Sequence, residues 1–121
     1  MTDHGAIRGV MLDTVDLDTT AEFWSALLGL EEVYRDETYA YLAKTGEDGI
    51  QLAFQLVPEE KVTKNRMHLD IEVPDREAFA RRLVEAGGSV ITEHQEGELP
   101  VWTVMADPLG NEFCIYARKS A

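Results

Sequence analysis

The chain contains the same local pattern twice, 59 residues apart. Residues 8–16 (RGVMLDTVD) and 67–75 (MHLDIEVPD) both alternate apolar with other residues, reach an aspartate and lead into a helical pattern that ends at glycine. A pattern that recurs in this way is typical of one supersecondary unit used twice. The copies differ in their polar residues, since His68 stands where the first copy has Gly9. We expect chemistry to have been gained or lost where the copies differ.

Each copy predicts one strand, one helix and three further strands. Asp16 or Asp18 can cap the first helix, which ends at Gly29, and Asp75 caps the second, which Gly87 and the glycine after it close. The strands are expected near residues 7–14, 31–36, 39–44 and 49–56, and near residues 67–73, 89–94, 101–106 and 111–117. This order predicts an α+β fold of tandem βαβββ modules, with the helix of each module against one face of its sheet.

The length of the chain sets its domain organisation. A chain of 121 residues can bury one real core but is too short for two ordinary domains. We therefore expect one domain over residues 1–121. Its first module covers about residues 7–57, a charged linker covers 58–66, and the second module covers about 67–118.

The final hairpins of the two copies match with an offset of 63 residues. This offset pairs Tyr39 with Trp102 and Gln51 with Cys114. Tyr39 and Trp102 are then assigned to the sides of their strands that face the helices, so both are expected in the core, with the lining of a ligand pocket as the alternative. His4 and His94 are expected to be surface residues without a role.

Strand alternation assigns a second, polar face to the sheets. In the strand near 67–73 the apolar side chains must face the helix, so His68, Asp70 and Glu72 face the other way. The same alternation sends four residues of other strands to that face: Met11, Gln51, Cys114 and Tyr116. Such a face is either an ordinary solvated surface or the wall of an enclosed cavity, and alternation alone leaves both interpretations open.

Composition excludes several classes of function. A formal net charge of -12 repels phosphate backbones, so nucleic acid is not an expected partner. No apolar run approaches the roughly 20 residues of a membrane span, so no membrane is expected, and the N-terminus lacks the pattern of a signal peptide. The single cysteine excludes an intrachain disulfide and fits a reducing compartment. These features predict a cytoplasmic protein.

Four segments of the chain match a known superfamily. They are the opening strand into Asp16, the segments 23–29 (FWSALLG) and 68–73 (HLDIEV), and the turn 107–113 (DPLGNEF). With these segments the chain resembles the vicinal oxygen chelate superfamily, which includes glyoxalase I, extradiol dioxygenases, fosfomycin-modifying enzymes and bleomycin-binding proteins. The resemblance implies tandem βαβββ modules whose curved mixed sheets surround a cavity, with the helices on the outer face, and it implies a homodimer. It says little about activity, because this fold supports many chemistries.

The resemblance also implies four metal-ligand positions, which here are Gly9, Gln51, His68 and Cys114. Gly9 offers no side chain, and Gln51 is a neutral donor where a carboxylate would be usual. A Cys114 thiolate would suit zinc better than Mg²⁺ or Mn²⁺. We therefore expect no bound metal and no cofactor.

Three functions remain open. The first is a metal-independent member of the superfamily that binds a small organic molecule through six residues: Met11, Gln51, His68, Asp70, Cys114 and Tyr116. The second is a lyase or isomerase of glyoxalase type, with His68 and Glu72 as acid and base or with zinc at His68 and Cys114. The third is a non-catalytic interaction module. Of these, binding of a small molecule is the function that the sequence favours.

Overall fold

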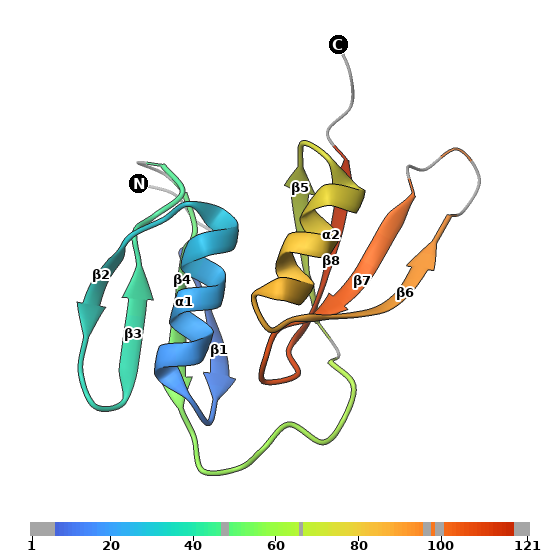
Figure 1. The fold of residues 1–121 in the computed structure, drawn as a ribbon. Helices are drawn as coiled ribbons and strands as arrows, with labels where there is room; N and C mark the ends of the chain where they lie inside the picture. Colours follow the sequence, from blue (N-terminus) through green and yellow to red (C-terminus); the bar gives the residue numbers. More distant parts are fainter. Residues whose placement is uncertain (1–6, 47–48, 66, 96–97, 99–100, 118–121) are drawn as a thin grey trace. The chain divides into compact units, whose positions relative to one another are not determined.

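The computed structural model describes residues 7–46, 49–65, 67–95, 98 and 101–117 (Figure 1). It divides into two compact units, Met1–Glu60 and Lys61–Ala121. The boundary between them falls inside the predicted linker at residues 58–66. Among the described residues, neither helix is long and apolar enough to cross a membrane.

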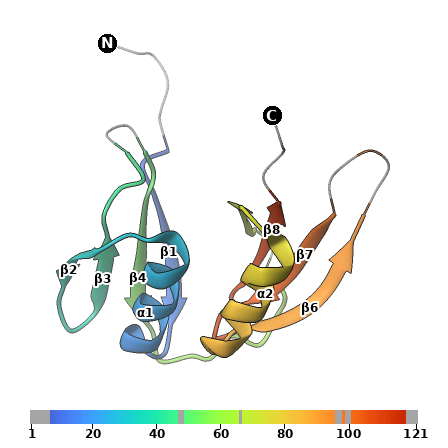
Figure 2. The same ribbon diagram turned by 45° about the horizontal axis from the view of Figure 1, so that its top comes forward.

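The first unit is a four-stranded mixed sheet with one helix across it (Figures 1 and 2). The sheet order is β1-β4-β3-β2, in which β1 and β4 are parallel and the other neighbours are antiparallel. Its elements are β1 (Gly9–Thr14), α1 (Leu17–Leu28), β2 (Glu32–Arg35), β3 (Tyr39–Leu42) and β4 (Gln51–Leu56).

The second unit repeats this topology, with sheet order β5-β8-β7-β6 and the parallel pair β5 and β8. Its elements are β5 (Leu69–Val73), α2 (Arg76–Glu85), β6 (Ser89–His94), β7 (Trp102–Ala106) and β8 (Glu112–Ala117). The two open sheets and their order confirm the predicted α+β fold of tandem βαβββ modules. The predicted strands differ from the observed ones only by one or two residues at their ends.

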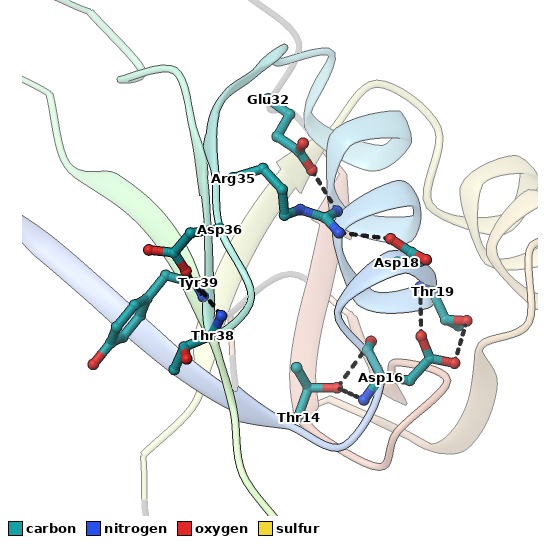
Figure 3. A network of polar contacts seen from close by, with 9 residues as sticks. All are labelled: Thr14, Asp16, Asp18, Thr19, Glu32, Arg35, Asp36, Thr38 and Tyr39. Carbon is teal, nitrogen blue, oxygen red and sulfur yellow. Dashed lines mark hydrogen bonds and ion pairs between the residues drawn. The ribbon is translucent and has the colours of Figure 1, made fainter.

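A network of polar contacts fixes the start of α1 (Figure 3). Asp16 is the cap, since its carboxylate accepts from the Thr19 backbone N–H at 3.1 Å and from the Thr19 hydroxyl at 2.7 Å. These bonds favour the ionised form and lower the pKa of Asp16. Asp18, the alternative cap, instead accepts a hydrogen bond at 2.6 Å from Arg35, which also reaches Glu32 at 2.7 Å. Arg35 thereby links the edge strand β2 to the helix.

The second unit holds its helix in a similar way. Asp75 caps α2 by accepting from the Ala78 backbone N–H at 3.1 Å, as the sequence predicted. The next residue, Arg76, donates to Glu93 of β6 at 2.6 Å and to the Thr103 hydroxyl of β7 at 2.8 Å. In each unit an arginine therefore connects the helix to an edge strand.

The side chains of β3 and β7 face opposite to the prediction. Fully buried Met105 belongs to the core of its unit, together with Phe113 and Ile115, whereas Trp102 is only half-buried. Trp102 is the cross-strand partner of Tyr116, so the two share the polar face of the sheet. In β3 the buried residues are Ala40 and Leu42, and Tyr39 is only half-buried. The prediction that Tyr39 and Trp102 face the helices was therefore wrong.

The predicted register of the last strands was also wrong. Val10 and Leu69 occupy the same position in the two units, and their partners are Leu52 and Phe113. The offset between β4 and β8 is therefore 61 residues, although the offset of 63 is correct for β3 and β7. In consequence Cys114 corresponds to Ala53, and the structural counterpart of Gln51 is Glu112. Both changes keep the same strand face, because they shift the match by two residues.

Candidate functional site

The polar face of the second sheet carries a hollow of about 550 Å³. Its walls come from β5, β8, β7 and β6, and from residues 64 and 65, which precede β5. Because neighbouring side chains on one face of a sheet stand in rows across the strands, the pairing register sets which residues meet in this hollow.

One row consists of three aromatic rings. Tyr116 of β8 pairs with Trp102 of β7, which pairs with His94 of β6. The rings of His94 and Trp102 are stacked, with centroids 5.5 Å apart and planes inclined by 24°. All three residues line the hollow, which therefore has an aromatic wall.

The next row contains Asp70 of β5, Cys114 of β8 and Val104 of β7, which are successive cross-strand partners. His68 precedes this part of β5, and its Nε2 lies 3.3 Å from Oδ1 of Asp70. The two side chains are 54% and 65% exposed, so this contact contributes little to stability. It does hold the imidazole at the rim of the hollow.

Cys114 lies at the floor of the hollow and is buried. Burial raises the pKa of its thiol, and the nearby carboxylates of Asp70 and Glu112 raise it further. A hydrogen bond to Asp70 acts in the same direction, and only Lys64 opposes it. Near neutral pH the thiol is therefore protonated and is a poor nucleophile.

The segment before β5 is attached to the start of β8. The Asn65 side-chain amide donates to the Glu112 carbonyl at 3.3 Å, and Nζ of Lys61 lies 3.7 Å from Oε2 of Glu112. These contacts place Lys64 and Asn65 along the hollow. A part of the predicted linker therefore forms one wall of the candidate site.

The structure brings four of the predicted site residues to one hollow: His68, Asp70, Cys114 and Tyr116. Glu72 lies on the same strand face, next to Tyr116, but outside the lining. Gln51 and Met11 belong to the first unit, where the Gln51 amide donates to the Leu42 carbonyl at 3.0 Å.

Sequence reasoning missed several lining residues, above all His94, and it gave the lining of a pocket only as the alternative for Trp102. His94 was expected to be a surface residue without a role; it is exposed, as expected, and it also lines the hollow. The signal that could have found it is its register position opposite Trp102. His4 lies outside the described residues.

The family-type metal positions do not fit a hard divalent ion. Gly9 supplies no donor, and a Cβ at this position would lie 3.3 Å from the Gln51 carbonyl oxygen, so the backbone is already close there. In the observed register the counterpart of Cys114 is Ala53, which has no donor atom, and the Gln51 amide donates to the Leu42 carbonyl. Cys114 keeps its proton near neutral pH, and a thiol is a poor ligand for Mg²⁺ or Mn²⁺.

A family model for the glyoxalase-like domain matches residues 9–116, which is nearly the whole chain. The chain belongs to the glyoxalase-like family. This confirms the resemblance to the vicinal oxygen chelate superfamily that the sequence segments indicated. No curated protein matches the chain by sequence.

Solved structures of glyoxalase-like proteins share this fold. A glyoxalase-related enzyme from Fulvimarina pelagi is 24% identical, with a TM-score of 0.73, and the match covers 93% of this chain and 88% of that one. A lactoylglutathione lyase from Agrobacterium tumefaciens is 18% identical, with a TM-score of 0.68 and 96% of both chains covered. A fosfomycin resistance protein from Mesorhizobium loti is 15% identical, with a TM-score of 0.71, 98% of this chain and 95% of that one covered. At these identities the likeness concerns the fold alone.

The raised pKa of Cys114 predicts slow alkylation. We expect iodoacetamide to modify the folded glyoxalase-like chain with a pH midpoint above that of the chain unfolded in urea, because the thiolate is the reactive form. Mass spectrometry can follow the reaction without ambiguity, since the chain has one cysteine. Asp70→Asn should lower the native midpoint by removing a negative charge and the hydrogen bond to the carboxylate. A native midpoint below that of the unfolded chain would refute the raised pKa.

Proposed function

We propose that this glyoxalase-like chain binds a small organic molecule in the hollow of the β5–β8 sheet and does so without a catalytic metal. The observation that carries the proposal is the hollow of about 550 Å³, with an aromatic row on one side and His68, Asp70 and Cys114 on the other. Its volume lies in the range of roughly 300–1,000 Å³ that is usual for small-molecule sites. Aromatic walls with a few convergent polar groups are also typical of such sites.

A ligand screen tests this proposal. The purified chain, kept in a chelator, is heated with libraries of aromatic compounds and antibiotics, and its melting temperature is followed. A ligand that binds only the folded state raises this temperature, and the rise grows with the logarithm of the ligand concentration divided by its Kd. We expect a set of aromatic hits whose effect is lost in Trp102→Ala. No stabilising compound, together with a hetero-partner recovered on pull-down, would favour the interaction module instead.

A lyase or isomerase of glyoxalase type is the second candidate. It is favoured by one specific arrangement: a donor atom from each of His68, Asp70 and Cys114 lies within 4.8 Å of the other two. Imidazole, carboxylate and thiolate are the ligands that zinc prefers. The lactoylglutathione lyase among the fold neighbours has this kind of activity by its description. Elemental analysis of protein purified without a chelator decides between the two candidates, because one zinc per chain would favour the lyase and overturn the metal-free proposal.

His68→Ala should change ligand binding and leave the fold intact. The side chain is half-exposed at the rim, and without a metal no metal-linked folding energy depends on it. We expect the free energy of unfolding to change by about 0.5 kcal/mol or less. Isothermal titration with a hit from the screen and urea unfolding measure the two effects. A large fall in the melting temperature, or the loss of a bound metal, would show that the role of His68 is different.

The chain is also proposed to form a homodimer. The edge strand β6 is exposed along its whole length, and Val90 and Ile91 are half-exposed on it. Unpaired edges and apolar side chains of this kind are commonly covered by a second copy. Sedimentation at micromolar concentration should give twice the chain mass, and Ile91→Lys should weaken the dimer more than Val84→Lys on α2. A monomer under these conditions would remove the claim.

A further inference from the structure

The aromatic row and the acidic side chains of the hollow lie next to each other. Tyr116 of β8 and Asp70 of β5 are on neighbouring strands and one row apart. A strand spacing of about 4.8 Å and a two-residue rise of about 6.6 Å separate them by roughly 8 Å. That distance is about the length of a two-ring aromatic molecule. A ring stacked on Trp102 and Tyr116 would therefore point its end toward Asp70.

The charged side chains of the lining are two carboxylates, Asp70 and Glu112, and one lysine, Lys64. Both carboxylates raise the pKa of the Cys114 thiol, which is the effect of nearby negative charge. Lys64 is the lysine of the lining, and it slightly lowers the pKa of the Cys114 thiol, against the stronger effect of the carboxylates. Lys61 is directed to the Glu112 carboxylate. The other titratable side chains of the lining are the two imidazoles and Tyr116.

Aromatic faces and carboxylates together favour one class of ligand. A flat ring gains stacking contacts with indole and phenol rings, and an attached cation gains attraction to their faces as well. A charged nitrogen donor forms short, charge-assisted hydrogen bonds to a carboxylate, which a neutral group cannot match. The net charge of -12 draws cations toward the chain from a distance.

We infer that the hollow selects a flat aromatic cation, with its rings against Trp102 and Tyr116 and its charged nitrogen at the Asp70 carboxylate. This inference rests on the proposed function and names the ligand class for the same site. Glu112 on the neighbouring strand is paired with Lys61 at 3.7 Å, so Asp70, whose side chain is 65% exposed, is the carboxylate assigned to the cation. Lys64 opposes the cation and so limits its affinity.

Three probes with the same two rings test the ligand class: 2-naphthamidinium, 2-naphthamide and 2-naphthoate. The probes differ in charge and little in shape. Isothermal titration of the full chain, at low ionic strength and with a chelator present, measures the affinity of each probe. We expect the amidinium to bind about tenfold more tightly than the amide, and the naphthoate to bind most weakly. Added salt should reduce the preference for the cation, because these groups are partly exposed.

Matched variants show which side chain causes the preference for the charged probe. Asp70→Asn should reduce the preference for the amidinium to about threefold or less and leave the affinity for the amide unchanged. Glu77→Gln on α2 removes the same charge from an exposed position of the same unit. It should change neither the preference for the amidinium nor the affinity for the amide. Lys64→Gln should strengthen amidinium binding. The melting temperatures of all variants are compared to show that they fold.

The outcomes separate the ligand class from the proposed function. If the amide or the naphthoate binds as tightly as the amidinium, the inferred class is wrong while the binding function stands. If Glu77→Gln reduces the preference as much as Asp70→Asn, the cation does not bind at Asp70, and the inference fails. If none of the three probes binds at millimolar concentration, the inference is overturned, and a screen without hits would then overturn the proposed function as well.

Discussion

Replacing Trp102 by alanine should weaken ligand binding by about 30-fold or more, because a central aromatic side chain in a binding site typically contributes at least 2 kcal/mol. Trp102 lies in the middle of the aromatic row, between His94 and Tyr116, and lines the hollow. The matched control is Tyr39→Ala, which truncates the residue at the corresponding position of the first unit. Isothermal titration with a hit from the screen measures both. An equal or larger loss in Tyr39→Ala would place the binding site in the first unit.

Met105→Ala should lower the free energy of unfolding by about 2–5 kcal/mol, the usual cost of truncating a fully buried methionine or leucine. Its neighbour Val104 faces the hollow and is half-buried, so Val104→Ala should cost about 1 kcal/mol or less. Urea unfolding of the two variants measures the difference. The opposite order of effects would mean that β7 presents its other face to the helix.

The elements of the fold were predictable because local signals agree with the global arrangement. The repeated pattern, the aspartate caps and the glycine after α1 fix the order of strands and helices. The turn at 107–111 is equally local, since the Asp107 carboxylate accepts from the Leu109 and Asn111 backbone N–H groups at 3.0 and 2.8 Å. Such contacts depend on neighbouring residues alone, so the sequence contains the information that predicts them.

The faces of β3 and β7 could not be predicted in this way. Both faces of β7 carry apolar side chains, with Trp102 and Val104 on one side and Met105 on the other. The single polar residue of β7 is buried, so alternation marked the wrong side as solvent-exposed and placed Trp102 on the side that faces the helix. The buried residue beside Met105 is the small, polar Thr103, which the sequence alone would assign to the surface.

The register of β8 was missed because the loops of the two units differ in length. Leu42 and Met105 correspond, as do Leu52 and Phe113, so the first unit has two more residues between β3 and β4 than the second has between β7 and β8. Matching the hairpins by sequence ignored this difference. The error moved Gln51 to the position of Cys114, but it left the strand face unchanged.

The candidate site was predictable where alternation alone sets the side-chain direction. His68, Asp70, Cys114 and Tyr116 follow from the alternation of β5 and β8, and all four line one hollow. The remaining walls depend on which strands are neighbours. The pairing of β6 with β7 brings in His94, and the hydrogen bond from Asn65 to Glu112 brings in the segment before β5.

A titration followed in the ¹H–¹⁵N spectrum of the full chain tests the central claim most directly, because it shows which residues meet the ligand. The probe is 2-naphthamidinium or a hit from the screen, added in the presence of a chelator. We expect the largest shifts at Trp102, including its indole N–H, and at Asp70, Cys114 and Tyr116. The resonance of the Trp24 indole N–H, in the core of the first unit, should not shift. Shifts confined to the first unit, or spread evenly over the chain, would contradict a binding site in the hollow of the second sheet.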